Sequence, residues 1–167
     1  MRSRFVSAVG SAVFLVIAPG TLAGWIPWRV TRWRFGAPFF GWGGTRVVGA
    51  ILILAGVPVL LEAFARFALV GRGTPAPVAA PERLVVSGLY RYVRNPMYLA
   101  VLSVGFGQAL LFGSRTLLWY AAVVGLAFHL FVLLYEEPTL RRRFGDEYDR
   151  YRAAVPRWWP KAGGYEA

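Results

Sequence analysis

The chain has 167 residues, of which 57% are hydrophobic and 16% charged, and its formal net charge is +11. Such a chain is too apolar for an ordinary soluble domain and too short for more than one membrane domain. Basic nucleic-acid binders spread their charge over a soluble polar fold, so this composition excludes nucleic acid as a partner. Zero cysteines and a single histidine, His129, exclude disulfides, thiolate nucleophiles and the usual metal clusters, so we expect no metal site.

Four apolar stretches approach the ~20 residues that a helix needs to cross the hydrocarbon core. They cover roughly residues 5–23, 47–70, 97–112 and 116–135. The third would be only ~24 Å long, so it either thins the bilayer or begins below the interface beside other protein. The last two are joined only by residues 113–115, which predicts a tight antiparallel hairpin. We therefore expect an all-α, polytopic membrane bundle of about four transmembrane helices with a short cytoplasmic helical segment at its C-terminal end.

The first stretch follows two arginines and ends in Thr21-Leu22-Ala23, which also fits a signal-peptide cleavage site. A retained span and a removed leader are both open. With a cytoplasmic N-terminus, most basic residues fall in the inner segments, as the positive-inside rule requires. These are Arg2, Arg4, Arg72, Arg83, Arg91, Arg94, Arg141, Arg142, Arg143, Arg150, Arg152, Arg157 and Lys161. We therefore expect a protein of the cell inner membrane with both termini in the cytoplasm.

A connector rich in proline, glycine and alanine, GRGTPAPVAAP, follows the second stretch at residues 71–81. Its first six residues formally match a dinucleotide fingerprint. No strand precedes them, however, and Pro75 and Pro77 prevent the helix that should follow. We divide the chain here into an N-terminal part, residues 1–83, and a cofactor-binding half, residues 84–167. Any cofactor must be held by membrane helices and their ends.

Two charged or polar features lie within the apolar stretches. Glu62 and Arg66 are spaced for a helical ion pair near the inner end of the second stretch. They form either a snorkelling pair or the wall of a polar pocket. His129 lies seven residues before Glu136, on nearly the same helical face and about two turns deeper. The pattern favours a histidine hydrogen-bonded to a neighbour over a catalytic base.

The third stretch begins at a polar motif, GLYRYVRNPMY, over residues 88–98. Asn95 is a good N-cap residue, and Pro96 suits the first helical position. A helix start carries free N–H groups and a partial positive charge, and Arg94 adds a fixed one. This corner therefore suits a carboxylate or a phosphate, although a well-made helix start alone would show the same residues.

The fourth stretch is expected to end at Glu136 and Glu137. Negative charge at a helix C-terminus is unfavourable and adjacent carboxylates repel each other, so the pair requires a partner. Either the arginines at 141–143 supply it, or one glutamate binds a cationic or hydroxylated ligand. Residues 146–154 then predict a short helix with Tyr148 and Tyr151 on one face, and the tryptophans at 158–159 predict a headgroup anchor.

The two motifs, GLYRYVRNPMY and EEPTLRRRFGDEYDRYRAAVPRWWP, flank a helical hairpin and resemble the isoprenylcysteine carboxyl methyltransferase and phospholipid methyltransferase superfamily. The resemblance covers roughly residues 84–160. It implies S-adenosylmethionine as the cofactor, bound at the cytoplasmic ends of the last two spans and enclosed by the C-terminal segment, without a Rossmann fold. It also implies a lipophilic acceptor that enters laterally from the bilayer.

The resemblance also implies site residues. Arg94, Asn95, Pro96 and Tyr98 match the first cofactor motif, Glu136 and Glu137 match the second, and Tyr90 is a further cofactor-binding candidate in the same segment. We expect Arg94, Glu136 and Glu137 to be catalytic and Arg141, Tyr148 and Tyr151 to contact the substrate. Asn95 stands where many relatives have histidine, which leaves the acceptor class open.

We therefore expect an integral-membrane, S-adenosylmethionine-dependent methyltransferase that acts on a lipophilic or lipid-attached acceptor, with O-methylation of an isoprenylcysteine-like carboxylate favoured. N-methylation of a phospholipid or small amine and S-methylation of a thiol are alternatives. A sterol-reductase-like, nicotinamide-dependent membrane reductase and a non-catalytic membrane subunit are alternatives of another class. The bilayer and the substrate are the expected partners, and the oligomeric state is open.

Overall fold

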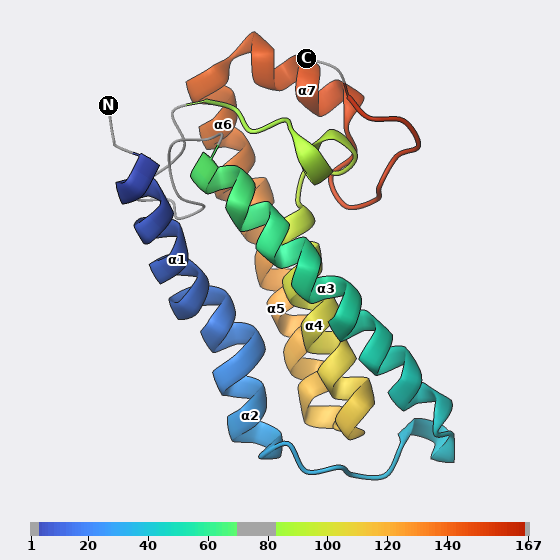
Figure 1. The fold of residues 1–167 in the computed structure, drawn as a ribbon. Helices are drawn as coiled ribbons and strands as arrows, with labels where there is room; N and C mark the ends of the chain where they lie inside the picture. Colours follow the sequence, from blue (N-terminus) through green and yellow to red (C-terminus); the bar gives the residue numbers. More distant parts are fainter. Residues whose placement is uncertain (1–3, 70–82, 166–167) are drawn as a thin grey trace.

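The computed structural model describes residues 4–69 and 83–165, and every regular element in these ranges is a helix. Within the described residues, three helical stretches are long and apolar enough to cross a membrane, namely Ala12–Thr31, Gly44–Arg66 and Arg115–Phe144, and Pro96–Phe112 is a shorter apolar helix. The expected helical membrane bundle is confirmed (Figure 1). The connector predicted at residues 71–81 lies outside the described residues.

The first helix extends further than expected. Helix α1 (Arg4–Gly20) continues through a π-turn, η1 (Thr21–Trp25), into α2 (Ile26–Thr31), where the expected end was Ala23. In the π-turn the Ile26 N–H bonds to Thr21 O, and Pro27 has no N–H to donate. The carbonyls of residues 22 and 23 therefore need other donors. The Tyr120 hydroxyl donates to Leu22 O at 2.9 Å, and Gln108 Nε2 donates to Ala23 O at 2.6 Å.

Helices α3 (Gly44–Leu69) and α4 (Pro96–Phe112) pack with their backbones close together. A Cβ atom added at Gly49 would lie 2.5 Å from Gly107 O, and one added at Gly107 would lie 2.7 Å from Gly49 O. Ser103 Oγ donates to Leu52 O across the same seam, at 2.8 Å. Small residues allow this approach, which gives apolar helices van der Waals contact where water supplies no driving force. The 3₁₀ turn η2 (Phe39–Gly41) precedes α3.

The predicted hairpin between the last two apolar stretches is confirmed. Gly113 closes α4 in the left-handed region at φ 64°, which glycine adopts without strain. Ser114 caps α5 (Arg115–Phe131) by accepting a hydrogen bond from the Leu117 N–H at 3.2 Å. Helix α4 has 17 residues, so its length of ~25 Å is also as expected.

The fourth apolar helix does not end at Tyr135, so that prediction is wrong. Helix α5 continues through a second π-turn, η5 (Val132–Glu136), into α6 (Glu137–Phe144). The Glu137 N–H bonds to Val132 O, and Pro138 follows at the first turn of α6. This repeats the arrangement around Pro27, in which a π-turn carries the helix past a residue that cannot donate. The two glutamates therefore lie within a helix rather than at its end.

The C-terminal part folds back over the helix ends. Helix α7 (Asp146–Ala154) follows Gly145 at φ 52°, which confirms the helix expected at 146–154. Residues 155–165 then run along the 3₁₀ turn η4 (Gly88–Arg91) and the start of α4. Arg94 N donates to Pro156 O at 3.0 Å, and Lys161 N donates to Tyr92 O at 3.0 Å.

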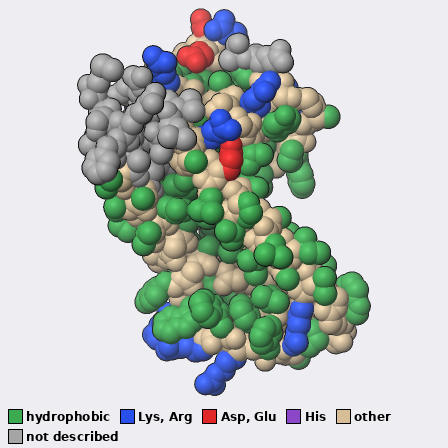
Figure 2. Space-filling view, in the orientation of Figure 1, with side chains coloured by type: hydrophobic (Ala, Val, Ile, Leu, Met, Phe, Trp, Pro, Cys, Tyr) green, Lys and Arg blue, Asp and Glu red, His purple; other side chains and the backbone are tan. Residues whose placement is uncertain are grey.

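Charge separates the two ends of the molecule. Helices α6 and α7 lie at one end together with the start of α1, whereas α2 and the α4–α5 turn lie at the other (Figure 1). On the face drawn in Figure 2, side chains over the middle are mostly hydrophobic, and acidic side chains occur only toward the end that holds α7. The candidate site residues of α6, α7 and the start of α4 belong to this polar end.

Candidate functional site

The start of α4 is placed as expected but capped differently. Asn95 occupies the N-cap position and Pro96 begins the helix, yet the Asn95 side chain makes no capping hydrogen bond. Its Nδ2 instead donates to Arg157 O at 3.1 Å, and the residue is buried. The amide thus fastens the C-terminal segment to the helix start, a role that local sequence does not reveal.

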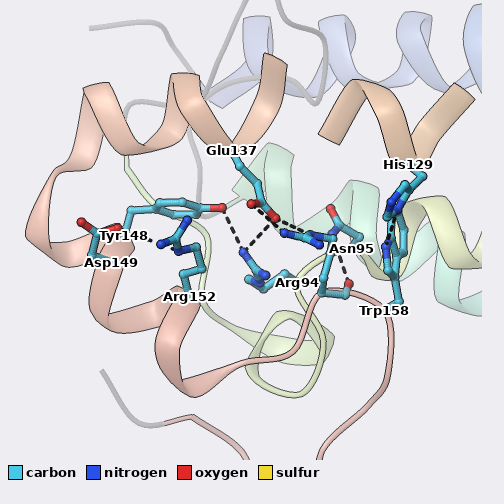
Figure 3. A network of polar contacts seen from close by, with 9 residues as sticks. Arg94, Asn95, His129, Glu137, Tyr148, Asp149, Arg152 and Trp158 are labelled. Carbon is cyan, nitrogen blue, oxygen red and sulfur yellow. Dashed lines mark hydrogen bonds and ion pairs between the residues drawn. The ribbon is translucent and has the colours of Figure 1, made fainter. Parts of the chain in front are cut away.

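Glu137 is buried, with 7% of its surface exposed, and two arginines neutralise it. Arg157 Nε donates to Oε1 at 2.6 Å and Nη2 donates to Oε2 at 3.0 Å, which is a bidentate pair. Arg94 Nη1 donates to the same Oε1 at 3.0 Å. Figure 3 shows Arg94 and Glu137 converging where α6, the start of α4 and the C-terminal segment meet.

Of the two alternatives for the glutamates, the one in which the arginines at 141–143 balance Glu137 is wrong. Arg141 pairs with Asp149 at 3.1 Å, and Arg142 donates to Thr139 Oγ1 at 3.4 Å. The Arg143 guanidinium lies over the Phe144 ring. Because the helix continues beyond the glutamates, these three arginines lie more than a turn further along α6, and all are exposed.

Glu136 faces a different partner from its neighbour. The Tyr98 hydroxyl donates to Glu136 Oε2 at 2.7 Å and links α4 to the end of η5. The Tyr98 ring also packs against Phe128, with centroids 4.7 Å apart. The structure therefore gives the two adjacent carboxylates separate environments, one with a tyrosine and one with two arginines.

Arg94 connects this network to α7. Besides Glu137, its Nη1 donates to the Tyr148 hydroxyl at 3.2 Å. Burial raises the pKa of Tyr148, so the hydroxyl stays neutral, whereas the hydrogen bond to Glu137 raises the pKa of Arg157 and keeps it charged. Arg94 Nε is buried and has no hydrogen-bond partner among the described residues. Buried donors are nearly always paired, so this N–H is an exception that needs an explanation.

The substrate-contact candidates in the C-terminal part fall into two groups. Tyr148 and Tyr151 share one face of α7, as expected, but both are buried. The Tyr151 hydroxyl donates to Tyr90 O at 2.7 Å, so both tyrosines hold α7 against the segment before α4. Arg141 is exposed and lines a cavity of about 550 Å³ that borders Glu137. Contact of these three residues with a substrate stays a prediction, as does contact of the buried Tyr90 with a cofactor.

His129 is hydrogen-bonded to a neighbour, as the sequence favoured. Trp158 Nε1 donates to His129 Nδ1 at 3.0 Å, and the two rings lie side by side (Figure 3). Trp159 is highly exposed, which suits the expected headgroup anchor, whereas Trp158 turns inward. Sequence reasoning missed Trp158 and Arg157 as site residues. The only available signal was their position in the second motif, because their partners lie 20 or more residues away.

Comparison with known proteins finds a family model and a curated relative that match this chain. The family model for phospholipid methyltransferases matches residues 45–147, from the start of α3 into α7. The Protein-S-isoprenylcysteine O-methyltransferase of Schizosaccharomyces pombe is 34% identical over 73 residues. That stretch is 44% of this chain and 31% of the relative, so the chain matches about a third of the relative's length. No solved structure matches the chain significantly.

Proposed function

This chain belongs to the phospholipid methyltransferase family, and on that premise we propose that it is an integral-membrane methyltransferase that uses S-adenosylmethionine to modify a lipophilic or lipid-attached acceptor. The observation that carries the proposal is the convergence of Arg94, Arg157 and Glu137 beside the Tyr98–Glu136 pair. All but Arg157 lie within the family match, at the polar end of the apolar helices.

The charges of the site fit the cofactor. S-adenosylmethionine carries a carboxylate, an ammonium, a sulfonium, a ribose diol and an adenine. The buried, unpartnered Nε of Arg94 suits the carboxylate, and Glu136 or Glu137 suits the ammonium or the diol. The Tyr98 ring suits the sulfonium or the adenine. When bound, this cofactor supplies a methyl group that is already activated as a sulfonium substituent.

The residues of this chain then have two tasks, which are to align the cofactor with the acceptor and to exclude water. Alignment of two reactants in general lowers the activation free energy by up to about 7–11 kcal/mol. Glu137 is held by three hydrogen bonds from two arginines, so its carboxylate has one defined orientation. Residues 155–165 cover the start of α4 through backbone bonds to Tyr92 and Arg94 and through the Asn95 amide. This cover separates the site from bulk water on that side.

The acceptor we favour is a carboxylate of the isoprenylcysteine type, because the S. pombe relative is named for O-methylation of isoprenylcysteine. A carboxylate is ionised at neutral pH and needs no base. An amine acceptor would first lose a proton, for which Glu136, Glu137 or water could serve. N-methylation of a phospholipid or small amine and S-methylation of a thiol therefore remain alternatives.

We also propose that the site faces the cytoplasm and that the protein lies in the cell inner membrane. The support is the gathering of arginines in α6, α7 and the segment before α4, against few at the α2 end. A basic excess of this kind marks the cytoplasmic side of membrane proteins.

Calorimetric titration of the detergent-solubilised protein with S-adenosylhomocysteine tests the proposal. We expect wild type to bind, and Glu137→Gln and Arg94→Ala to bind at least about tenfold more weakly, since each loses a charge-assisted contact. Arg115→Ala, at the opposite end of α5, is the matched control and should bind like wild type. A folded wild-type protein that does not bind contradicts the proposal. Binding of a nicotinamide cofactor instead would favour a reductase, and binding of neither would favour a non-catalytic subunit.

A further inference from the structure

The end of the bundle opposite α6 and α7 carries positive charge and no negative charge. Residues 32–43, the α2–α3 loop, cross this end beside the α4–α5 turn (Figure 1). The sequence has no Asp or Glu in residues 1–61 or 96–135, from which this end is built. Glu62, the first carboxylate, lies toward the other end of α3, where it forms the expected ion pair with Arg66 at 2.7 Å. The basic residues of this end are Arg29, Arg32, Arg34, Arg46 and Arg115.

The contacts of these arginines are with neutral groups. The Arg32 guanidinium carbon lies 4.6 Å from the centroid of the Trp28 ring, and that of Arg46 lies 5.3 Å from the centroid of the Phe35 ring. Arg46 Nη2 donates to Gly36 O at 2.7 Å. Within the part of the chain that the structure describes, no arginine of this end forms an ion pair. Their charge is therefore available to an anion from outside the chain.

The α2–α3 loop is fastened to the ends of the helices. Gly36 N donates to Phe112 O at 2.9 Å, and the Phe35 and Phe112 rings pack with centroids 5.2 Å apart. Where the loop enters α3, Thr45 Oγ1 donates to Trp42 O at 2.9 Å. The loop therefore presents a defined set of side chains at this end of the bundle.

Aromatic side chains of the loop point away from the protein. Phe40 is 98% exposed, and Trp33 and Trp42 are also exposed. Phe40 and Trp33 have positive φ angles, 57° and 53°, which are unfavourable for bulky residues. The exposed side chains of Val47 and Ile51 follow on α3, so the apolar surface continues along a membrane-spanning helix. Rings in this position are unfavourable in water and favourable where lipid headgroups meet hydrocarbon.

Arginines and exposed rings at the end of apolar helices match one environment. A guanidinium binds a phosphate through parallel hydrogen bonds, and aromatic rings concentrate at the level of the headgroups. Figure 2 shows basic side chains beside hydrophobic ones at this end of the face that it draws. A soluble anion would satisfy the arginines and leave the rings in water. A phospholipid with a net negative charge satisfies both.

We propose that the α2–α3 loop, together with Arg29, Arg46 and Arg115, binds the headgroups of anionic phospholipids in the membrane leaflet opposite Glu137. The arginines contact the phosphates, and the rings of Trp33, Phe40 and Trp42 lie between the headgroups. This lipid anchors the protein and is not a methyl acceptor, because the length of the bundle separates the loop from Glu137 (Figure 1). The inference therefore does not depend on the proposed function.

Quenching of tryptophan fluorescence by brominated lipids tests the proposal, because most tryptophans of the chain lie at this end. The full chain carries Trp159→Phe, which removes the exposed tryptophan of the other end. It is reconstituted into vesicles of phosphatidylcholine and phosphatidylglycerol in equal parts, with bromine on one lipid or on the other. We expect brominated phosphatidylglycerol to quench at least about twofold more strongly. Equal quenching by the two lipids overturns the proposal.

Two double variants locate the lipid contact. Arg29→Gln with Arg34→Gln removes two exposed guanidinium groups that make no side-chain hydrogen bond or ion pair with the described residues. We expect it to lower the preference for phosphatidylglycerol at least about twofold. Arg142→Gln with Arg143→Gln removes the same charge from the exposed side of α6 and is the matched control. A preference that survives the first change, or that the control lowers equally, overturns the assignment to this end.

Phe40→Asn tests the placement of the aromatic rings. Asparagine adopts a positive φ more readily than phenylalanine, so the change should stabilise a loop whose ring faces water. It should destabilise a loop whose ring lies between headgroups. We expect the midpoint of thermal unfolding in the same vesicles to fall by about 2–4 °C, and Phe40→Tyr, which keeps an interfacial ring, to unfold like wild type. A Phe40→Asn midpoint equal to or above that of wild type overturns the placement of the ring.

Discussion

Arg157 donates two parallel hydrogen bonds to Glu137, from Nε to Oε1 at 2.6 Å and from Nη2 to Oε2 at 3.0 Å, and so ties the C-terminal segment to α6. Arg94 donates to the same carboxylate from the start of α4. Three parts of the chain that are distant in sequence therefore meet at one buried charge. Removing a charge from this network affects both the fold and the site.

We expect Arg157→Ala to lower the free energy of unfolding by up to about 3 kcal/mol, because it leaves Glu137 buried with a single arginine. Arg157→Lys should recover only part of this stability, because the ammonium keeps the positive charge but cannot donate in bidentate geometry. Thermal unfolding in detergent measures both effects. Arg143→Ala, in an exposed arginine that stacks on Phe144, is the control. Equal stability of Arg157→Ala and Arg143→Ala would show that the bidentate pair contributes nothing.

The membrane spans and the hairpin between α4 and α5 could be predicted from the sequence. A helix in lipid must satisfy its own backbone, so the apolar stretches and their lengths identify the spans directly. The α4–α5 hairpin follows as well, because Gly113 and Ser114 end one helix and cap the next within three residues. The positions of Asn95 and Pro96 at the start of α4 are equally local features. Each of these predictions depends on neighbouring residues only.

The remaining features depend on residues that are distant in sequence. Prolines at 27 and 138 normally interrupt a helix, yet π-turns carry both helices past them, and Tyr120 satisfies a carbonyl that the first π-turn exposes. Glu137 takes its partner from position 157 rather than from the nearer arginines of α6. Spacing along a helix cannot reveal such pairs, because they form only when the C-terminal segment folds back.

The donors to the first π-turn give a second prediction. Tyr120→Phe leaves Leu22 O without its hydrogen bond. We expect the free energy of unfolding to fall by about 1–3 kcal/mol, because a carbonyl beside lipid has no water molecule to bond instead. Tyr135→Phe removes the hydroxyl of an exposed tyrosine and is the matched control. Thermal unfolding of the two variants gives the difference. A Tyr120→Phe protein as stable as the control would mean that Leu22 O needs no side-chain donor.

The glycine seam between α3 and α4 gives a third prediction. Gly107→Ala places a methyl group 2.7 Å from Gly49 O, so the two helices must separate. We expect the free energy of unfolding to fall by about 1–3 kcal/mol. Gly24→Ala is the control, because a Cβ there has no atom within 4 Å. The close seam is disproved if the two variants unfold at the same temperature.

Buried tyrosines of the C-terminal part predict how stability depends on alkaline pH. Burial raises the pKa of Tyr148 and Tyr151 in the folded protein above the value of about 10 that an unfolded tyrosine has. The unfolded chain therefore loses these protons first. The stability they support is complete below about pH 10 and declines as the pH rises above that value. Tyr151→Phe removes one such proton, so its free energy of unfolding should fall less steeply above about pH 10.

Denaturant unfolding at a series of pH values measures this slope, and tyrosinate absorbance of the folded protein follows the ionisation directly. Tyr151→Phe also loses the hydrogen bond to Tyr90 O, so its stability at neutral pH should be lower by about 1 kcal/mol while its alkaline slope is shallower. Tyr135→Phe, in an exposed tyrosine, should keep the wild-type slope. The loss of stability at neutral pH and the slope of stability against alkaline pH are independent quantities. A Tyr151→Phe protein with the wild-type slope would show that this hydroxyl ionises as readily in the folded protein as in the unfolded chain.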